Sequence, residues 1–170
     1  MRNILTGLLL FLSVTISVAQ NAPCACCTEA HTQFDFWIGE WDVTLPNGAK
    51  AGENTIVKEQ GGCVIKESWT SANGNFTGTS FNYYNTMTEQ WEQLWLDVAG
   101  TILKLKGKRV GNEMILRSDP ALQEDGTSQI QQITYTLNED GSIRQLWEVL
   151  QDEVSVSVLF DGLYRKKKQG

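Results

Sequence analysis

Aromatic side chains and a few polar ones alternate along several segments of this sequence, and together they could bind a small ligand. Because every second residue of a β-strand points to the same face, this alternation predicts strands with a mixed aromatic and polar face. Small-molecule pockets use aromatic surface for affinity and a few polar groups for orientation. The candidate pocket residues are Glu67, Trp69, Tyr83, Trp91, Gln93, Trp95, Arg144, Trp147 and Glu148.

The alternation does not fix which of these side chains point inward, so two interpretations stay open. In the first, Arg144 anchors an anionic group of the ligand. The stacking surface for the apolar part of that ligand would be Trp69, Tyr83, Trp95 and Trp147. In the second, the tryptophans are ordinary core residues, and Glu67, Arg144 and Glu148 are paired across strands on the solvent side.

Catalytic motifs are scarce in this sequence. The only histidine is His31, so any relay of Ser or Cys with His would have to run through it. The sequence has no Gly-rich phosphate loop and no Gly-x-Ser-x-Gly turn. A carboxylate pair such as Glu67 with Glu148 could do acid–base work, but among 20 acidic residues such pairs arise by chance. We therefore expect a protein that is not an enzyme and holds no cofactor, with an enzyme that uses a polar interior cluster as an alternative.

The four cysteines, Cys24, Cys26, Cys27 and Cys63, allow two kinds of site. In an exported chain they would form disulfides, one of which would join the N-terminal tail to the domain through Cys63. The alternative is a zinc or copper(I) site made by the cysteines with His31. In an exported chain the disulfides are favoured over the metal site. His31 itself is expected to be a surface or capping residue.

Residues 1–19 have the features of a cleaved secretory signal. Arg2 precedes an apolar run, and Ser17-Val18-Ala19 has the small-x-small pattern of a signal peptidase site. The run is too short for a stable transmembrane helix. With 14 basic and 20 acidic residues, the chain lacks the basic excess of nucleic-acid-binding proteins. We therefore expect a periplasmic or secreted protein whose partner is a small hydrophobic or amphipathic molecule.

Short segments rich in β-branched and aromatic residues fill most of the chain, and turn signals such as Gly111-Asn112 separate them. The predicted strands are 39–45, 50–59, 63–70, 76–84, 90–98, 101–110, 113–118, 128–137, 143–150 and 153–165. One helical turn is expected at 28–33. Because an open meander would expose two sheet edges, we predict an all-β fold, a single antiparallel up-and-down β-barrel of about ten strands. The barrel would span residues 31–168, after a cysteine-rich tail at 20–30.

Gly39-Glu40-Trp41, at the start of the first predicted strand, resembles the Gly-x-Trp opening of calycins, the superfamily of lipocalins and fatty-acid-binding proteins. In calycins this tryptophan plugs the closed end of the barrel, and a basic residue near the end of the last strand packs across it. The resemblance implies a closure role for Gly39 and Trp41, with Arg165 as the cationic partner. Trp37 would cover the same end from the helical turn.

The chain is also similar to a family of exported bacterial proteins of unknown function with a lipocalin-like barrel. The segments that carry this similarity are 34–43, 61–64, 67–69, 82–84, 91–97, 144–148 and 160–165. The similarity implies a fold but no activity. Fatty-acid-binding proteins hold the fatty carboxylate with an Arg-x-Tyr pair, where this chain has Tyr164-Arg165. Haem-binding barrels use a histidine late in the chain, whereas His31 precedes the first strand.

Overall fold

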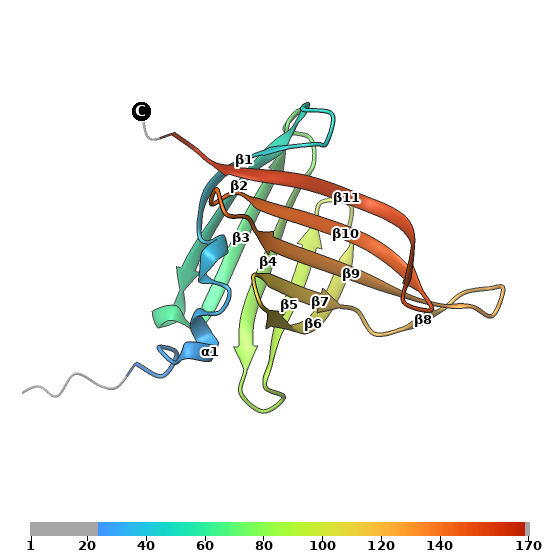
Figure 1. Cartoon of the computed structure of the whole chain (residues 1–170), viewed down its shortest axis with the longest axis horizontal. Coiled ribbons are helices and arrows are strands. Elements are labelled where there is room, and N and C mark those ends of the chain that lie inside the picture. Colours follow the sequence, from blue (N-terminus) through green and yellow to red (C-terminus); the bar gives the residue numbers. More distant parts are fainter. Residues whose placement is uncertain (1–23, 169–170) are drawn as a thin grey trace, which may run out of the picture.

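Eleven β-strands make up most of residues 24–168, the part of the chain that this computed structural model describes (Figure 1). The strands are β1 (Gly39–Thr44), β2 (Lys50–Glu59), β3 (Val64–Ser71), β4 (Thr77–Asn85), β5 (Gln90–Asp97), β6 (Ile102–Val110), β7 (Glu113–Arg117), β8 (Ala121–Leu122), β9 (Ser128–Leu137), β10 (Ile143–Gln151) and β11 (Val154–Lys166). The helical pieces are α1 (Glu29–Thr32) and the 3-10 turns η1 (Asp35–Trp37) and η2 (Gln60–Gly62). The secretory signal predicted at 1–19 lies outside the described residues.

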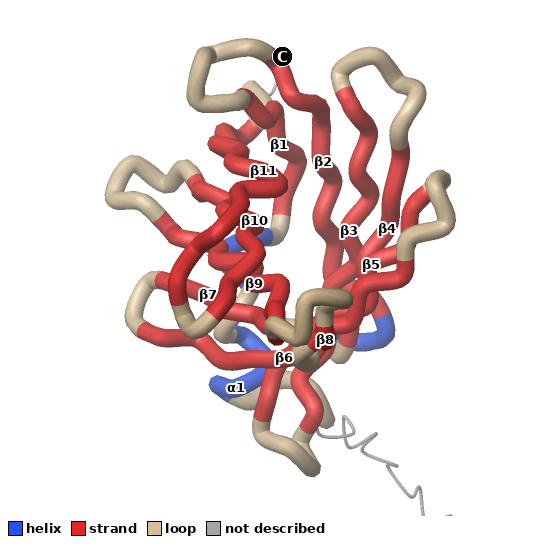
Figure 2. The backbone as a smooth tube through the Cα atoms, turned by 90° about the vertical axis from the view of Figure 1, so that its right-hand side faces the viewer, coloured by secondary structure: helices blue, strands red, loops and turns tan. Residues whose placement is uncertain are grey.

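The strands form one antiparallel sheet that closes on itself, because β1 pairs with β11 as well as with β2. Figure 2, viewed from the β8 side, shows the strands following one another around the barrel. Ten strands form the ring, and the two-residue β8 is an extra strand beside β9. The prediction of a single up-and-down barrel of about ten strands is therefore confirmed. Closure supplies a partner to the first and the last strand, which would otherwise be sheet edges.

One end of the barrel is covered by the segment that precedes β1. Figure 1 shows α1 at this covered end, while β8 and the β10–β11 hairpin lie at the opposite, open end. The side chains of Phe34, Trp37 and Trp41 are fully buried at the covered end. The rings of Phe34 and Trp37 stack with centroids 5.0 Å apart, and the Trp41 indole N–H donates to the Trp37 carbonyl at 2.9 Å. The structure thus places Trp37 and Trp41 where the calycin resemblance implies a plug.

The cation that lies over Trp41 is Lys166, and the role expected of Arg165 is wrong by one residue. The Lys166 Nζ atom is 5.3 Å from the Trp41 ring. Trp41 is paired with Lys166 across the β1–β11 ladder, so these two side chains share a face, whereas Arg165 is paired with Asp42 and is exposed. Gly39 has a φ of +144°, a conformation that favours glycine, and it lies against the Lys166 side chain.

All four cysteines are paired, as Cys24–Cys27 and Cys26–Cys63. The second disulfide joins the tail to the turn between β2 and β3, which confirms the predicted link through Cys63. The alternative of a zinc or copper site is wrong, because both disulfides consume the thiolates that would bind the metal.

His31 is buried rather than exposed, contrary to the expectation for a surface residue. Its Nδ1 atom is 2.7 Å from the Thr28 hydroxyl, and its ring meets the ring of Tyr84 edge-on at 5.3 Å. The short helix α1 contacts β4, and Tyr84 of that strand packs against the histidine ring. His31 therefore helps to dock the tail on the barrel.

Replacement of Trp41 by alanine tests the role of the plug. We expect Trp41→Ala to lower the free energy of unfolding by about 3–5 kcal/mol, because it removes a fully buried indole and leaves a cavity. Urea unfolding followed by far-UV circular dichroism measures the change. Phe81→Ala, at a partly exposed position on β4, is the control and should cost much less. An equal loss in the two variants would contradict the plug.

Candidate functional site

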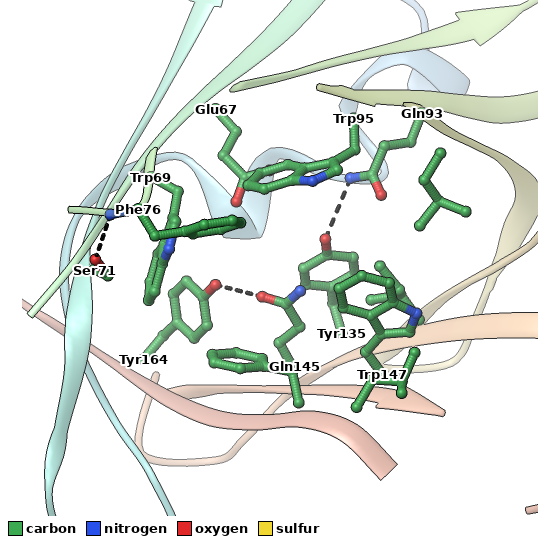
Figure 3. A pocket seen from close by; sticks show the side chains of 14 residues that line it. Glu67, Trp69, Ser71, Phe76, Gln93, Trp95, Tyr135, Gln145, Trp147 and Tyr164 are labelled. Atoms are coloured by element: carbon green, nitrogen blue, oxygen red, sulfur yellow. Dashed lines mark hydrogen bonds between the residues drawn. The ribbon is translucent and has the colours of Figure 1, made fainter. Parts of the chain in front are cut away.

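The barrel encloses a cavity of about 410 Å³ between the aromatic plug and the open end (Figure 3). Five large rings supply most of its wall, and polar side chains are grouped on its inner surface. The rings belong to Trp69, Phe76, Trp95, Trp147 and Phe160. The polar side chains are those of Glu67, Gln93, Tyr135, Gln145 and Tyr164. Both the volume and the mixed wall are typical of small-molecule sites.

Five of the residues predicted from the alternation line this cavity. They are Glu67 and Trp69 on β3, Gln93 and Trp95 on β5, and Trp147 on β10. Glu67 and Gln93 are each 3% exposed, so they are core residues as well as wall residues. On these strands, the face with the tryptophans points inward, as the first interpretation predicted.

Arg144 and Glu148 point away from the cavity, which overturns the predicted anionic anchor. On β10, Gln145 and Trp147 are paired with Tyr135 and Ile133 of β9, whose side chains point inward. Arg144 and Glu148 alternate with them and therefore belong to the outer face.

The outward Arg144 forms an ion pair with Asp161 of β11, through two hydrogen bonds of 2.9 and 2.8 Å. The guanidinium holds the pKa of the Asp161 carboxyl below its usual value. Arg144 is therefore occupied at the barrel surface and is not free to bind a ligand in the lumen.

Tyr83 and Trp91 also lie outside the cavity, for different reasons. Tyr83 follows the inward Asn82 on β4, so it points outward, where its hydroxyl donates to Glu92 at 2.7 Å. Trp91 points inward but lies at the covered end. Its ring meets Phe34 at 5.6 Å, and its indole N–H donates to the Ala30 carbonyl at 3.2 Å. Trp91 therefore belongs to the plug.

Glycines inside three strands make room for the rings of the wall. They are at positions of the inner face: Gly52 on β2, Gly78 on β4 and Gly162 on β11. A Cβ atom at Gly52 would overlap the Trp69 indole, and one at Gly78 would overlap the Trp95 indole.

At Gly162 the same overlap would occur with the Phe160 ring. The rings therefore occupy the space that a Cβ atom would need at these positions, and the cavity stays open beside them.

The carboxyl of Glu67 is the centre of a polar network at the base of the cavity. Its Oε1 atom accepts from the Asn54 amide and its Oε2 atom from the Ser80 hydroxyl, both at 2.6 Å. The Asn54 amide also donates to the Tyr164 hydroxyl at 3.3 Å, and Tyr164 in turn donates to Gln145. The network therefore joins strands on opposite sides of the barrel.

A second branch of the network passes through Asn82 and Gln93. The Asn82 amide donates to the Ser80 hydroxyl at 2.9 Å, and the Gln93 amide donates to the Asn82 carbonyl oxygen at 2.7 Å and to the Tyr135 hydroxyl at 3.2 Å. Figure 3 shows Gln93 and Gln145 with their tyrosine partners inside the lumen. These bonds satisfy polar groups that would be costly to bury alone.

Burial raises the pKa of the Glu67 carboxyl to about 7, although hydrogen bonds from Ser80 and Asn54 oppose the shift. Burial also raises the pKa of the Tyr135 and Tyr164 hydroxyls well above the usual value, so both stay neutral. Among residues 24–168, none that lines the cavity is Lys, Arg or His. Glu67 is thus the one group of the wall that changes charge near neutral pH.

The sequence interpretation missed Tyr135, Tyr164 and Gln145 as cavity residues. Gln145 lies on the same face of β10 as Trp147, but the predicted set took Arg144 and Glu148 of the other face as its polar residues. The mid-strand glycines Gly52 and Gly78 were a signal of the aromatic wall, since glycine inside a strand often marks a close approach of another group.

No protein-family model matches the sequence, and no curated protein matches it significantly. The barrel fold is thus shown, while membership of the calycin superfamily stays a prediction. The feature of the structure that bears on function is the cavity.

The raised pKa of Glu67 predicts a pH-dependent stability. A carboxyl whose pKa is about 7 in the folded chain and 4.5 when unfolded stabilises the fold fully below pH 4.5. This contribution is lost progressively as the pH rises to about 7, because the unfolded chain releases the proton first. We expect Glu67→Gln, which stays neutral, to gain about 3 kcal/mol relative to the wild type between pH 4.5 and pH 8.

Urea unfolding of both proteins across this pH range measures the difference. Glu124→Gln, at an exposed position between β8 and β9, is the control for a general effect of removing one carboxylate. A pH-independent difference between wild type and Glu67→Gln would contradict the raised pKa.

Proposed function

We propose that this protein is an exported, non-catalytic barrel that binds a small, partly apolar ligand in its lumen. The observation that supports the proposal is the cavity of about 410 Å³, with aromatic walls and a few hydrogen-bonding groups at its base. Aromatic wall surface would supply affinity, and the polar base would orient the ligand. The covered end leaves the open end as the side from which such a ligand would enter.

Export is supported by the two disulfides, which persist in oxidising compartments and are rare in the cytosol. The signal-like sequence at 1–19 points the same way. Among residues 24–168, no helix has the length and apolar character needed to cross a membrane.

A structural or interaction module with a solid barrel is the alternative in which no ligand enters. It would require side chains to fill the lumen, as they do in many small barrels. The inward glycines at 52, 78 and 162 have the opposite effect, because they withdraw side-chain volume from the wall. This observation favours the ligand-binding proposal.

An enzyme is the second candidate function, and the polar cluster around Glu67 is the observation in its favour. A carboxyl with a pKa of about 7 has the value expected of a general base at neutral pH. The wall offers no His, Lys or Cys among its described residues that could serve as a second catalytic group. Glu67 also accepts hydrogen bonds from Asn54 and Ser80, which suits a fixed binding group. We therefore rank binding first.

Ligand binding can be tested by native mass spectrometry of the protein with a panel of lipids and small metabolites. We expect a one-to-one complex and a change in tryptophan emission, because Trp69, Trp95 and Trp147 line the cavity. The variant Trp41→Ala, altered in the plug, should keep the same ligand preference. Only the free mass and unchanged emission across the whole panel would contradict the proposal.

The glycine at 78 offers a test of the cavity without changing a wall side chain. We expect Gly78→Ala to weaken binding about tenfold, because the new methyl group would push the Trp95 indole into the lumen. Isothermal titration with the ligand found by mass spectrometry measures the effect. Thr79→Ala, at the next position of β4, is the matched control and should bind as the wild type does. Equal affinities for Gly78→Ala and the wild type would count against this site.

A further inference from the structure

The cavity carries a single acidic charge and no basic one. Every other polar side chain of its wall is an amide, a hydroxyl or an indole, and none of the described wall residues is Lys, Arg or His. Arg144, the cation nearest in sequence to the wall residues of β10, is paired with Asp161 outside. An anionic ligand would therefore enter the lumen without a counter-charge and beside Glu67. Burying a charge without a partner is unfavourable, so the wall selects against carboxylates and phosphates.

The Glu67 carboxyl is fixed by two hydrogen bonds and keeps acceptor sites for a hydrogen-bond donor of a ligand. Its two oxygens each accept one hydrogen bond, from Asn54 and from Ser80, at 2.6 Å. An ionised carboxylate has about four acceptor sites, so each oxygen keeps room for one more donor. The bonds come from strands on both sides of β3 and fix the rotamer. Glu67 is also part of the cavity wall, so a donor on a bound ligand can reach it.

Two indoles lie beside this carboxyl in the cavity wall. Glu67 is paired with Ser80, and Ser80 is paired with Trp95, which places the three residues in one row across β3, β4 and β5. Trp69 follows Glu67 by two residues on the same face of β3. Figure 3 shows Trp69 and Trp95 with their rings beside the lumen, together with Glu67. Faces of tryptophan attract cations, especially where water is excluded.

We infer that the lumen takes a lipophilic amine, whose protonated nitrogen pairs with Glu67 and whose hydrocarbon part lies along the tryptophan wall. This inference rests on the proposed ligand-binding function and names the chemical class of the ligand. An alkylammonium group offers up to three N–H donors, as a lysine side chain does, and matches the free acceptor sites of the carboxylate. The net charge of −6 on the whole chain also favours the approach of a cation over that of an anion.

The groups that face Glu67 are uncharged, so the charge of its carboxyl depends on the pH and on the bound ligand. Asn54 and Ser80 on β2 and β4 are uncharged, and Tyr135 and Tyr164 on β9 and β11 are held neutral by burial. With a pKa of about 7, Glu67 is protonated below neutral pH and charged above it. A nearby ammonium would favour the charged form. The preference for amines should therefore be strong at pH 8.5 and lost at pH 5.5.

Three probes with the same eight-carbon chain test the inference: octylamine, 1-octanol and octanoate. Their affinities are measured by isothermal titration at pH 8.5 and pH 5.5, with the full disulfide-bonded protein. At pH 8.5 we expect octylamine to bind at least about tenfold more tightly than octanol, and octanoate more weakly than octanol. At pH 5.5 the difference between amine and alcohol should fall to within about twofold, since an alkylamine with a pKa near 10 stays protonated while Glu67 does not.

Two variants separate the carboxyl from the remaining wall. Glu67→Gln should remove the amine preference at pH 8.5 and leave octanol affinity within about twofold of the wild type, because only the charge changes. Glu92→Gln, which removes a carboxylate from the outer face of β5, should keep the amine preference. The pH comparison in the wild type provides the same test without any substitution.

The possible outcomes distinguish the amine inference from the ligand-binding proposal. Octanol binding without a preference for octylamine, or tighter binding of octanoate, would overturn the amine inference and leave the ligand-binding proposal intact. An amine preference that persists in Glu67→Gln would also overturn it. Failure of all three probes to bind would also overturn the amine inference, whereas the proposed function is tested separately by the panel of lipids and metabolites.

Discussion

The packing of Trp41 beneath the ends of the first and last strands is the contact on which the barrel depends. Trp41 lies on β1, its indole N–H is bonded to the turn that precedes β1, and Lys166 of β11 lies over its ring. One side chain therefore joins the covering segment, the first strand and the last strand. Closure of a ten-strand sheet requires the two ends of the chain to meet at a fixed register, and this contact lies where they meet.

The plug also determines where polar groups can be buried. Because Phe34, Trp37 and Trp41 exclude water from the covered end, the side chains above them must satisfy one another. Glu67 and its partners do so through hydrogen bonds that span the lumen, except that the Asn54 Oδ1 atom has no partner among the described residues. The same exclusion of water raises the pKa of Glu67, so a structural feature at one end creates the electrostatic character of the cavity above it.

Much of this architecture was predictable from the sequence. Alternating residues and turn signals predicted the strands, and the all-β barrel followed from the need to pair the first and last of them. Glu67, Trp69, Gln93 and Trp95 were also predictable as candidate wall residues, although the alternation left open whether their face points inward.

The errors have a common physical origin, because a period of two groups side chains without saying which group is inside. On β10 the charged Arg144 was chosen and the inward Gln145 was missed. On β11 the prediction named Arg165 as the cation over Trp41, whereas the structure has the next residue, Lys166. Both were decided by pairing with a distant strand, which no local pattern records.

The glycines behind the aromatic wall affect how substitutions can change the width of the cavity. In most pockets the volume is altered by exchanging the side chains that touch the ligand, which changes shape and chemistry together. Here Gly78 and Gly162 lie behind rings of the wall, so a methyl group added at either position would press on an indole or a phenyl ring without replacing it. At Gly52 an added methyl group would also meet the backbone carbonyl of Thr70, which leaves no room for it. The barrel can thus adjust the width of its lumen while keeping the same carboxyl and the same aromatic surfaces. The width of the cavity and the chemistry of its wall therefore depend on separate positions of the chain.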